Sequence, residues 1–173
     1  MKKYIVIYNK NSRGKTYSKQ DLEMIFSSHD LDSKIFVTNE IKEVDKIVKN
    51  FKNSKDYVYC AIGGDGTLNS LINALLRNNI NNPEVACIAS GSGSDFMRTF
   101  AMPVDIHQAI SRIKNNQNYS IDASFIESKT KSRYFINVLN YGFLAETVNL
   151  SEKLPNMFKR FRYPISFWLK LFT

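Results

Sequence analysis

Two kinds of segment alternate along the first two thirds of the chain. Short runs of β-branched and aromatic residues predict buried strands of a covered parallel sheet. Longer segments with apolar residues three and four positions apart predict helices that bury one face. The expected strands are residues 3–9, 34–38, 57–62 and 85–89, and the expected helices are residues 18–28, 41–51, 67–77, 95–100 and 105–115.

This alternation predicts an α/β fold, an open and mostly parallel sheet with helices on both faces. The pattern changes after residue 117, where two strand-like runs, 118–127 and 133–139, flank a polar turn and predict a hairpin. One aromatic and basic segment, 156–173, then predicts a helix. A hairpin and one helix are too small to bury a separate core. We therefore expect an α/β domain over residues 1–117 and the opening of a β-rich second domain over 118–173.

Composition and charge narrow the class of protein. The chain is 43% hydrophobic and 23% charged, which excludes a disordered chain. It contains no apolar run long enough for a transmembrane helix and no signal-peptide pattern, so we expect a cytoplasmic protein. The net charge of +8 favours an anionic partner, which could be a nucleotide, a nucleic acid or a lipid surface.

The cysteines and histidines predict no site. Cys60 and Cys87 lie inside apolar strand runs, which is typical of buried thiols rather than of a disulfide or a metal site. His29 and His107 have no ligand partners near them in the sequence, so we expect surface residues of helices.

The strongest chemical signal is Gly63-Gly64-Asp65-Gly66-Thr67, between an expected strand and an expected helix. Glycines allow an anion to approach the backbone closely, and the N–H groups of a helix N-terminus attract phosphate. Asp65 would repel bare phosphate, so it predicts a bridging Mg²⁺ or a hydrogen bond to a hydroxyl. The plainer interpretation is a tight turn in which the aspartate caps the helix.

Two further polar loops follow expected strands. Residues 9–16 nearly match a P-loop, but Asn9 replaces the first glycine, so we reject a P-loop enzyme while keeping the loop as a phosphate contact. Residues 90–95 form a Gly/Ser-rich turn. Ligands of open parallel sheets bind at the carboxyl ends of the strands. We therefore expect the loops holding Ser12, Asp65 and Ser92 to meet at one edge and enclose a single nucleotide.

These motifs together resemble the diacylglycerol kinase catalytic domain family, which includes bacterial lipid kinases and sphingosine kinases. The resemblance rests on residues 63–69, with residues 91–98 downstream and residues 9–14 upstream. Residues 121–122, 135–138 and 142–145 also match later segments of that family, so the resemblance covers essentially the whole chain. It implies phosphorylation of a lipid hydroxyl, such as that of diacylglycerol, with ATP and Mg²⁺ as cofactors.

The resemblance also implies a set of site residues. Asp65 would be the catalytic and metal-binding residue. The implied nucleotide contacts are Asn9, Asn11, Ser12, Gly14, Thr38, Gly63, Gly64, Asp65, Gly66, Thr67, Asn69, Ser92 and Asp95. The sequence departs from the family pattern at Ser70, Ser94 and Leu144, where Glu, Asn and Asp are usual.

Family members are longer and carry a C-terminal β-rich domain that supplies the presumed general base. We therefore expect this chain, as a fragment or a shortened homologue, to bind nucleotide weakly and to phosphorylate lipid poorly. Two alternatives stay open: an NAD kinase-like enzyme, which shares the GGDG turn, and a non-catalytic nucleotide-binding module. A nucleic-acid binder has no supporting motif.

The last segment allows two interpretations. Phe158, Phe161, Ile165, Trp168, Leu169 and Phe172 follow helical spacing, with Lys159, Arg160 and Lys170 between them. Such a stripe either packs on a neighbouring domain or contacts an anionic membrane peripherally. If nothing covers it, we expect self-association, as a homo-oligomer.

Overall fold

The computed structural model describes residues 2–12, 14–52, 56–90, 94–115, 118–139 and 142–172. The chain divides into two compact units, Met1–Ile136 and Asn137–Thr173, and each is described by itself. The predicted domain boundary between residues 117 and 118 stays a prediction, because compactness alone does not define where a second domain begins.

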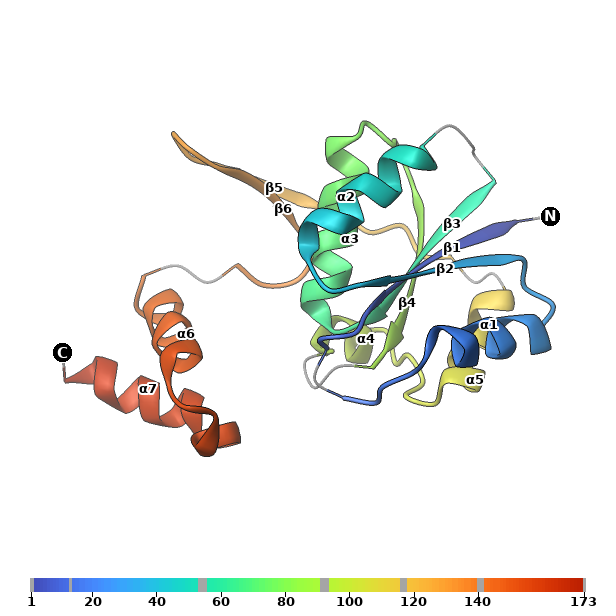
Figure 1. Cartoon of the computed structure of the whole chain (residues 1–173). Helices are drawn as coiled ribbons and strands as arrows, with labels where there is room; N and C mark the ends of the chain where they lie inside the picture. Colours follow the sequence, from blue (N-terminus) through green and yellow to red (C-terminus); the bar gives the residue numbers. More distant parts are fainter. Residues whose placement is uncertain are drawn as a thin grey trace. The chain divides into compact units, whose positions relative to one another are not determined.

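The described residues of the first unit form a parallel sheet of four strands (Figure 1). The strands are β1 (Lys3–Asn9), β2 (Ser33–Thr38), β3 (Tyr57–Gly63) and β4 (Glu84–Ala89), in the spatial order β2-β1-β3-β4. Their carboxyl ends are in register, with Asn9 opposite Thr38 and Gly63 opposite Ala89. Because β2 lies on one side of β1 while β3 and β4 lie on the other, the order of the strands reverses between β1 and β3.

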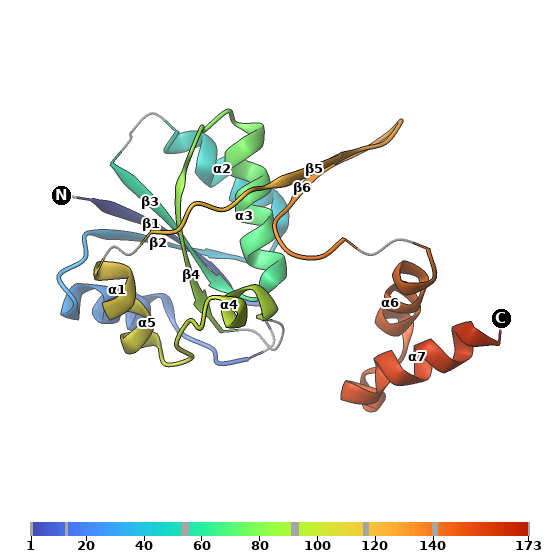
Figure 2. The same ribbon diagram turned by 180° about the vertical axis from the view of Figure 1, so that it is seen from behind.

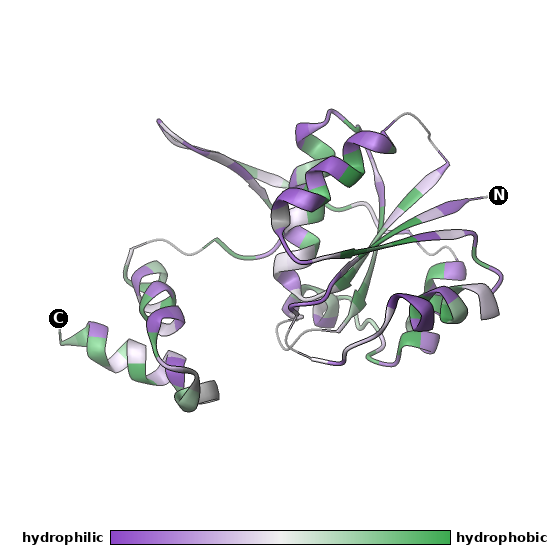
Figure 3. Cartoon of the chain, in the orientation of Figure 1, coloured by the Kyte–Doolittle hydropathy of each residue, from purple (hydrophilic) through white to green (hydrophobic). Residues whose placement is uncertain are grey.

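Helices cover both faces of this sheet, which confirms the predicted α/β fold (Figures 1 and 2). Along β1, Tyr4, Val6 and Tyr8 face one core, and Ile5 and Ile7 face the other. The first core contains residues of α1 (Lys19–Ser28) and α5 (Ile106–Lys114), and the second contains residues of α2 (Ile41–Asn50) and α3 (Asp65–Arg77). The hydropathy colouring shows the apolar residues concentrated along the strands and on the helix faces that meet them (Figure 3).

Local capping explains where several helices begin. The Ser18 hydroxyl accepts from the N–H of Asp21, whose carboxylate accepts from the N–H of Ser18, which completes a capping box on α1. The Asp105 carboxylate caps α5 by accepting from the N–H of Gln108 at 3.0 Å. Helix α3 begins at Asp65, two residues earlier than predicted, because its glycine-rich first turn carries no apolar periodicity.

A short antiparallel hairpin also belongs to the first unit. It consists of β5 (Ser124–Glu127) and β6 (Ser132–Phe135), both shorter than the predicted strands. The short helix α4 (Asp95–Thr99) follows β4. The side chain of Asn73 on α3 holds β6 by its backbone: Nδ2 donates to the carbonyl of Tyr134 at 2.8 Å, and Oδ1 accepts from its N–H at 3.0 Å.

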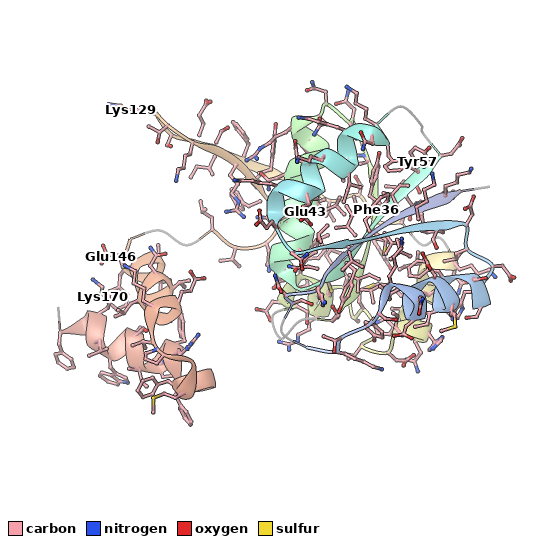
Figure 4. All side chains as sticks on the ribbon, in the orientation of Figure 1. Phe36, Glu43, Tyr57, Lys129, Glu146 and Lys170 are labelled. Carbon is pink, nitrogen blue, oxygen red and sulfur yellow. The ribbon has the colours of Figure 1, made fainter. Side chains whose placement is uncertain are left out.

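The second unit contains α6 (Phe143–Lys153), the 3₁₀ segment η1 (Asn156–Phe161) and α7 (Arg162–Leu171). Helix α6 was not predicted, because residues 142–145 were considered only as part of a family motif and no element was assigned to residues 146–153. Phe143 and Phe167 meet edge to face at 5.4 Å, and Lys170 pairs with Glu146 at 3.0 Å (Figure 4). Among the described helices, none is both long and apolar enough to cross a bilayer.

Candidate functional site

The loops after β1 and β3 meet at the reversal point of the sheet. Asn9, the last residue of β1, donates from Nδ2 to the Thr67 hydroxyl in the first turn of α3 at 3.3 Å. Crevices at such reversal points are where open parallel sheets bind ligands. The structure therefore brings these two predicted site residues together at the edge where a ligand is expected.

The glycines after β3 serve different purposes. A Cβ atom on Gly63 would overlap the Thr67 hydroxyl and lie 2.6 Å from the Thr67 Cβ, so only glycine fits at the end of β3. Gly64 is the N-cap residue of α3 and has no side chain to cap it, so among the described contacts the N–H groups of Asp65 and Gly66 are available to a ligand, while the Thr67 N–H donates to the Gly64 carbonyl at 3.0 Å. A Cβ on the exposed Gly66 would meet no described atom within 4 Å, which leaves space for a bulky group beside this turn.

The half-buried side chain of Asp65 connects the loop after β3 to the loop after β4. Its carboxylate accepts from the backbone N–H of Asp95 at 2.9 Å and of Phe96 at 3.2 Å. It therefore caps the N-terminus of α4, a contact between loops that sequence reasoning did not identify. The predicted role of Asp65 in binding Mg²⁺ stays a prediction.

The loops after β1 and β4 also meet. The hydroxyls of Ser12 and Ser90 lie 3.3 Å apart, and the N–H of the buried Ser90 donates to the carbonyl of Gly63 at 3.0 Å. The loop after β1, which holds Ser12, and the loop after β3, which holds Asp65, thus both contact the loop after β4, at its described ends Ser90 and Asp95. This is the convergence of loops that the sequence predicts. Ser92 itself lies outside the described residues. Asp95 is described, and its exposed carboxylate pairs with Arg98 at 2.9 Å.

The loop after β1 is ordered by its own side chains and by β2. The Asn9 carbonyl oxygen Oδ1 accepts from the N–H of Asn11 at 2.9 Å, and Asn11 Nδ2 donates to the backbone carbonyl of Asn39 at 3.1 Å. The buried Thr38 donates its hydroxyl to the backbone carbonyl of Tyr8 at 3.3 Å. Gly14 is exposed at the same loop. These contacts place Asn9, Asn11, Ser12 and Thr38 at one sheet edge.

Asn69 contacts the hairpin. With its amide oriented to satisfy both neighbours, it donates to the Tyr134 carbonyl at 3.1 Å and accepts from Arg133 at 2.9 Å. It lies one turn before Asn73, which also binds Tyr134. The spacing of Asn69, Asn73 and Arg77 along α3 was the available signal for this polar stripe, and sequence reasoning missed the stripe. A nucleotide contact for Asn69 stays a prediction.

The two cysteines are free thiols; Cys60 is buried, as predicted, whereas Cys87 is half-buried. Burial raises the pKa of the Cys87 thiol to about 11, and the negative charge of Asp65 adds to this shift while Arg112 opposes it. Burial also raises the pKa of the Cys60 thiol, with a smaller contribution from Cys87. Both thiols are therefore protonated near neutral pH, which makes them poor nucleophiles and metal ligands.

The donor set at the sheet edge suits a phosphate-bearing ligand. The open N–H groups at the start of α3 and the hydroxyl of Ser12 can donate to phosphate oxygens, and the Asp65 carboxylate can bind a cation. Two hydrogen bonds leave part of the acceptor capacity of that carboxylate unused. Within the described ranges, no three His, Cys, Asp or Glu side chains cluster around one metal position. Any Mg²⁺ here would accordingly depend on phosphate oxygens and water for most of its ligands.

Comparison with known proteins identifies relatives of this chain. The diacylglycerol kinase catalytic domain family matches residues 3–126. A diacylglycerol kinase of Staphylococcus saprophyticus is 29% identical over 171 residues, which cover 96% of this chain and 53% of that protein. A diacylglycerol kinase of Staphylococcus haemolyticus is 32% identical over 119 residues, which cover 68% of this chain and 34% of that protein.

Solved structures agree with this similarity. The crystal structure of a diacylglycerol kinase from Bacillus anthracis matches with a TM-score of 0.56 and 26% identity, covering 70% of this chain and 42% of that chain. The chain spans about half the length of the Staphylococcus saprophyticus relative.

Proposed function

The chain belongs to the diacylglycerol kinase catalytic domain family, and we propose that it is the ATP-binding part of a lipid kinase. The reaction transfers the γ-phosphate of ATP to a lipid hydroxyl such as that of diacylglycerol. The observation that carries this proposal is the convergence of three loops on the uncapped N-terminus of α3, at the reversal point of the sheet. The family match favours a lipid kinase over an NAD kinase-like enzyme.

In this proposal the backbone does most of the binding. The first N–H groups of α3 hold the phosphates, and the space beside Gly66 lets them approach. Ser12, Asn9 and Asn11 keep the loop after β1 against the same edge. Phosphoryl transfer depends mainly on positioning and charge neutralisation, so a rigid cradle of N–H donors suits it.

Asp65 is the residue proposed to hold Mg²⁺. When bound, the ion would neutralise negative charge on the phosphates. The carboxylate keeps its orientation through the N–H groups of Asp95 and Phe96, which also fix the loop after β4. The lipid oxygen attacks the γ-phosphorus, the bond to the β-phosphate oxygen breaks, and ADP leaves. The general base that takes the hydroxyl proton is not assigned to any residue here.

We expect the 173-residue polypeptide alone to bind Mg-ATP weakly and to phosphorylate lipid poorly. The chain covers about half of the Staphylococcus saprophyticus relative, and the family resemblance implies that the general base lies in a C-terminal β-rich domain. Calorimetric titration of Mg-ATP into the folded polypeptide tests the first part, with the Mg²⁺-free titration as its control. A folded chain that binds no nucleotide contradicts the proposal.

We expect kinase activity to require the C-terminal domain of the longer family members. To test this, the chain is fused to the C-terminal part of the Staphylococcus saprophyticus relative that it does not cover. Transfer of labelled phosphate from ATP to diacylglycerol is then compared with transfer to NAD. Transfer to diacylglycerol alone supports the lipid kinase, and transfer to NAD supports the rival enzyme. Nucleotide binding with transfer to neither acceptor favours a non-catalytic module.

Membrane contact and self-association through residues 156–172 are also proposals. Exposed aromatic residues of this segment, Phe161 (59% exposed), Trp168 (59%) and Phe172 (80%), support them. Co-sedimentation with anionic vesicles, set against light scattering of the chain alone, distinguishes membrane contact from association of copies. The cytoplasmic location stays a prediction.

A further inference from the structure

Two histidines that sequence reasoning left without a ligand partner lie against each other. His29 Nε2 and His107 Nδ1 are 3.1 Å apart, and the ring centroids are 5.3 Å apart with an interplanar angle of 35°. His29 is the residue at the C-terminal end of α1, and His107 is the second residue of α5. Neither histidine has a ligand partner near it in the sequence, but the fold brings together these two residues, which are separated by 78 positions.

The core of the protein brings these rings together. Leu22 and Phe26 of α1 and Ile110 of α5 are fully buried in one cluster on the same face of the sheet. An ion pair at 3.2 Å between Lys114 and Asp30 connects the same two helices near the histidines. The backbone positions of both histidines are thus held by packing that does not depend on the contact between their rings.

The separation of the two nitrogens matches a shared metal ion. Imidazole nitrogens bind divalent transition metals at about 2.0–2.1 Å. Two nitrogens 3.1 Å apart, each at that distance from one ion, subtend an angle of about 98° at the metal. This angle lies between the square-planar and tetrahedral values that Cu²⁺ and Zn²⁺ adopt.

We propose that His29 and His107 form a binding site for a divalent transition metal, which links α1 to α5. The site differs from the predicted Mg²⁺ position in chemistry, because Mg²⁺ prefers oxygen ligands. Since the described residues hold no third His, Cys, Asp or Glu ligand in a cluster with these two, water completes the coordination. Imidazole binds a metal only in its neutral form, so metal binding should weaken as the solution becomes acidic.

The test uses the 173-residue chain freed of metal. ZnCl₂ and CuCl₂ are titrated separately by calorimetry at neutral pH, and thermal unfolding is followed with and without each metal. We expect one saturable equivalent per chain, tighter binding of Cu²⁺ than of Zn²⁺, and a higher Tm with metal. His29→Gln and His107→Gln each remove one nitrogen ligand. Loss of a residue that only supports a metal ligand weakens metal affinity by roughly tenfold or more. Each Gln variant, which loses a ligand itself, should therefore bind the metal at least about tenfold more weakly than the parent.

Gln108→Ala is the matched control, because Gln108 neighbours His107 on α5 and offers no imidazole. This variant should keep the parent's affinity and the metal-dependent rise in Tm. His107 is exposed and His29 only partly buried, so the Gln variants are expected to fold, which the metal-free Tm verifies. Equal binding by the Gln variants and the parent, or no saturable binding by the parent, overturns the proposal.

Discussion

The carboxylate of Asp65 accepts a hydrogen bond from the backbone N–H of Asp95 at 2.9 Å. A second bond from the N–H of Phe96 at 3.2 Å makes Asp65 the cap of α4, although the two residues follow different strands. The residue expected to bind a cation is therefore also a structural connection between two loops. Any substitution at Asp65 has to be judged on both roles.

Asp65→Ala should lower both stability and Mg-ATP affinity. The lost cap is expected to cost about 1 kcal/mol in the free energy of unfolding. Asp65→Asn keeps one oxygen acceptor, so it should recover part of that stability while leaving Mg-ATP binding weak. Urea unfolding and calorimetric titration measure the two effects separately.

The control for this prediction is the cap on α5. Asp105→Ala removes an equivalent carboxylate cap, that of the Gln108 N–H, away from the loops of the candidate site. It should cost similar stability and leave Mg-ATP affinity unchanged. If Asp65→Asn binds Mg-ATP as tightly as the parent, the carboxylate has no part in nucleotide binding.

Two glycines of the same turn should respond in opposite ways to alanine. Gly63→Ala places a Cβ atom within 2.6 Å of the Thr67 Cβ, so the start of α3 must shift. Overpacking of this kind is expected to destabilise the fold by roughly 1–3 kcal/mol. Urea unfolding of the variant measures this loss.

Gly66→Ala is the matched variant, because its added methyl group meets no described atom within 4 Å. Alanine also suits a helix better than glycine, so stability should stay the same or rise by up to about 1 kcal/mol. The added methyl group occupies the space proposed for phosphate, and Mg-ATP binding should weaken. A Gly66→Ala chain with undiminished Mg-ATP affinity would place the nucleotide elsewhere.

Local patterns were sufficient to predict most of the first unit. Strands β1 and β3 are buried on both faces and read as continuous apolar runs, while α1 and α5 carry recognisable caps at Ser18 and Asp105. The meeting of three loops followed from the parallel order of strands. These features depend on residues close in sequence and on one general rule about parallel sheets.

The contacts that sequence reasoning missed are between distant residues. The His29–His107 pair, the Asp65–Phe96 hydrogen bond and the Asn73–Tyr134 pairing each depend on how distant elements pack against one another. Helix α6 was missed because its first residues were considered only as part of a family motif and its apolar spacing is weak. Such details follow from tertiary packing, which local periodicity does not encode.

Asn73 should anchor the hairpin. Its buried amide pairs with both backbone groups of Tyr134, so Asn73→Ala leaves the Tyr134 N–H without this acceptor, while the Tyr134 carbonyl keeps the donor of Asn69. We expect a loss of roughly 1–3 kcal/mol for an unpaired group that stays buried. Hydrogen exchange at the amide of Tyr134 should accelerate.

Asn73→Asp is the informative partner variant. It keeps an acceptor for the Tyr134 N–H and loses the donor to the Tyr134 carbonyl, so protection of the Tyr134 amide should be largely retained. If Asn73→Ala leaves exchange at Tyr134 unchanged, other contacts hold β6 against α3, and the side-chain pairing is not the anchor.

The raised pKa of the Cys87 thiol predicts that the folded chain loses stability in alkaline solution. Its pKa rises from the ordinary value of 9.0 to about 11 in the folded chain, mainly through burial and then through the charge of Asp65. Between these values the unfolded chain loses the thiol proton and the folded chain keeps it. The free energy of unfolding should therefore fall as pH rises from about 9 to 11, by at most roughly 1.4 kcal/mol per pH unit for this group. Below pH 9 this contribution is fully present.

Comparison with a Cys87→Ala chain isolates this contribution, because the tyrosines and Cys60 titrate in both proteins. The parent should lose stability more steeply than the variant across this pH range in urea unfolding, and the two slopes should agree below it. Alkylation by iodoacetamide gives a second measurement, since the thiolate is the reactive form. In the folded parent, Cys87 should react slowly at pH 8 and accelerate toward pH 11, whereas rapid alkylation at pH 8 would mean that the thiol is neither buried nor held protonated.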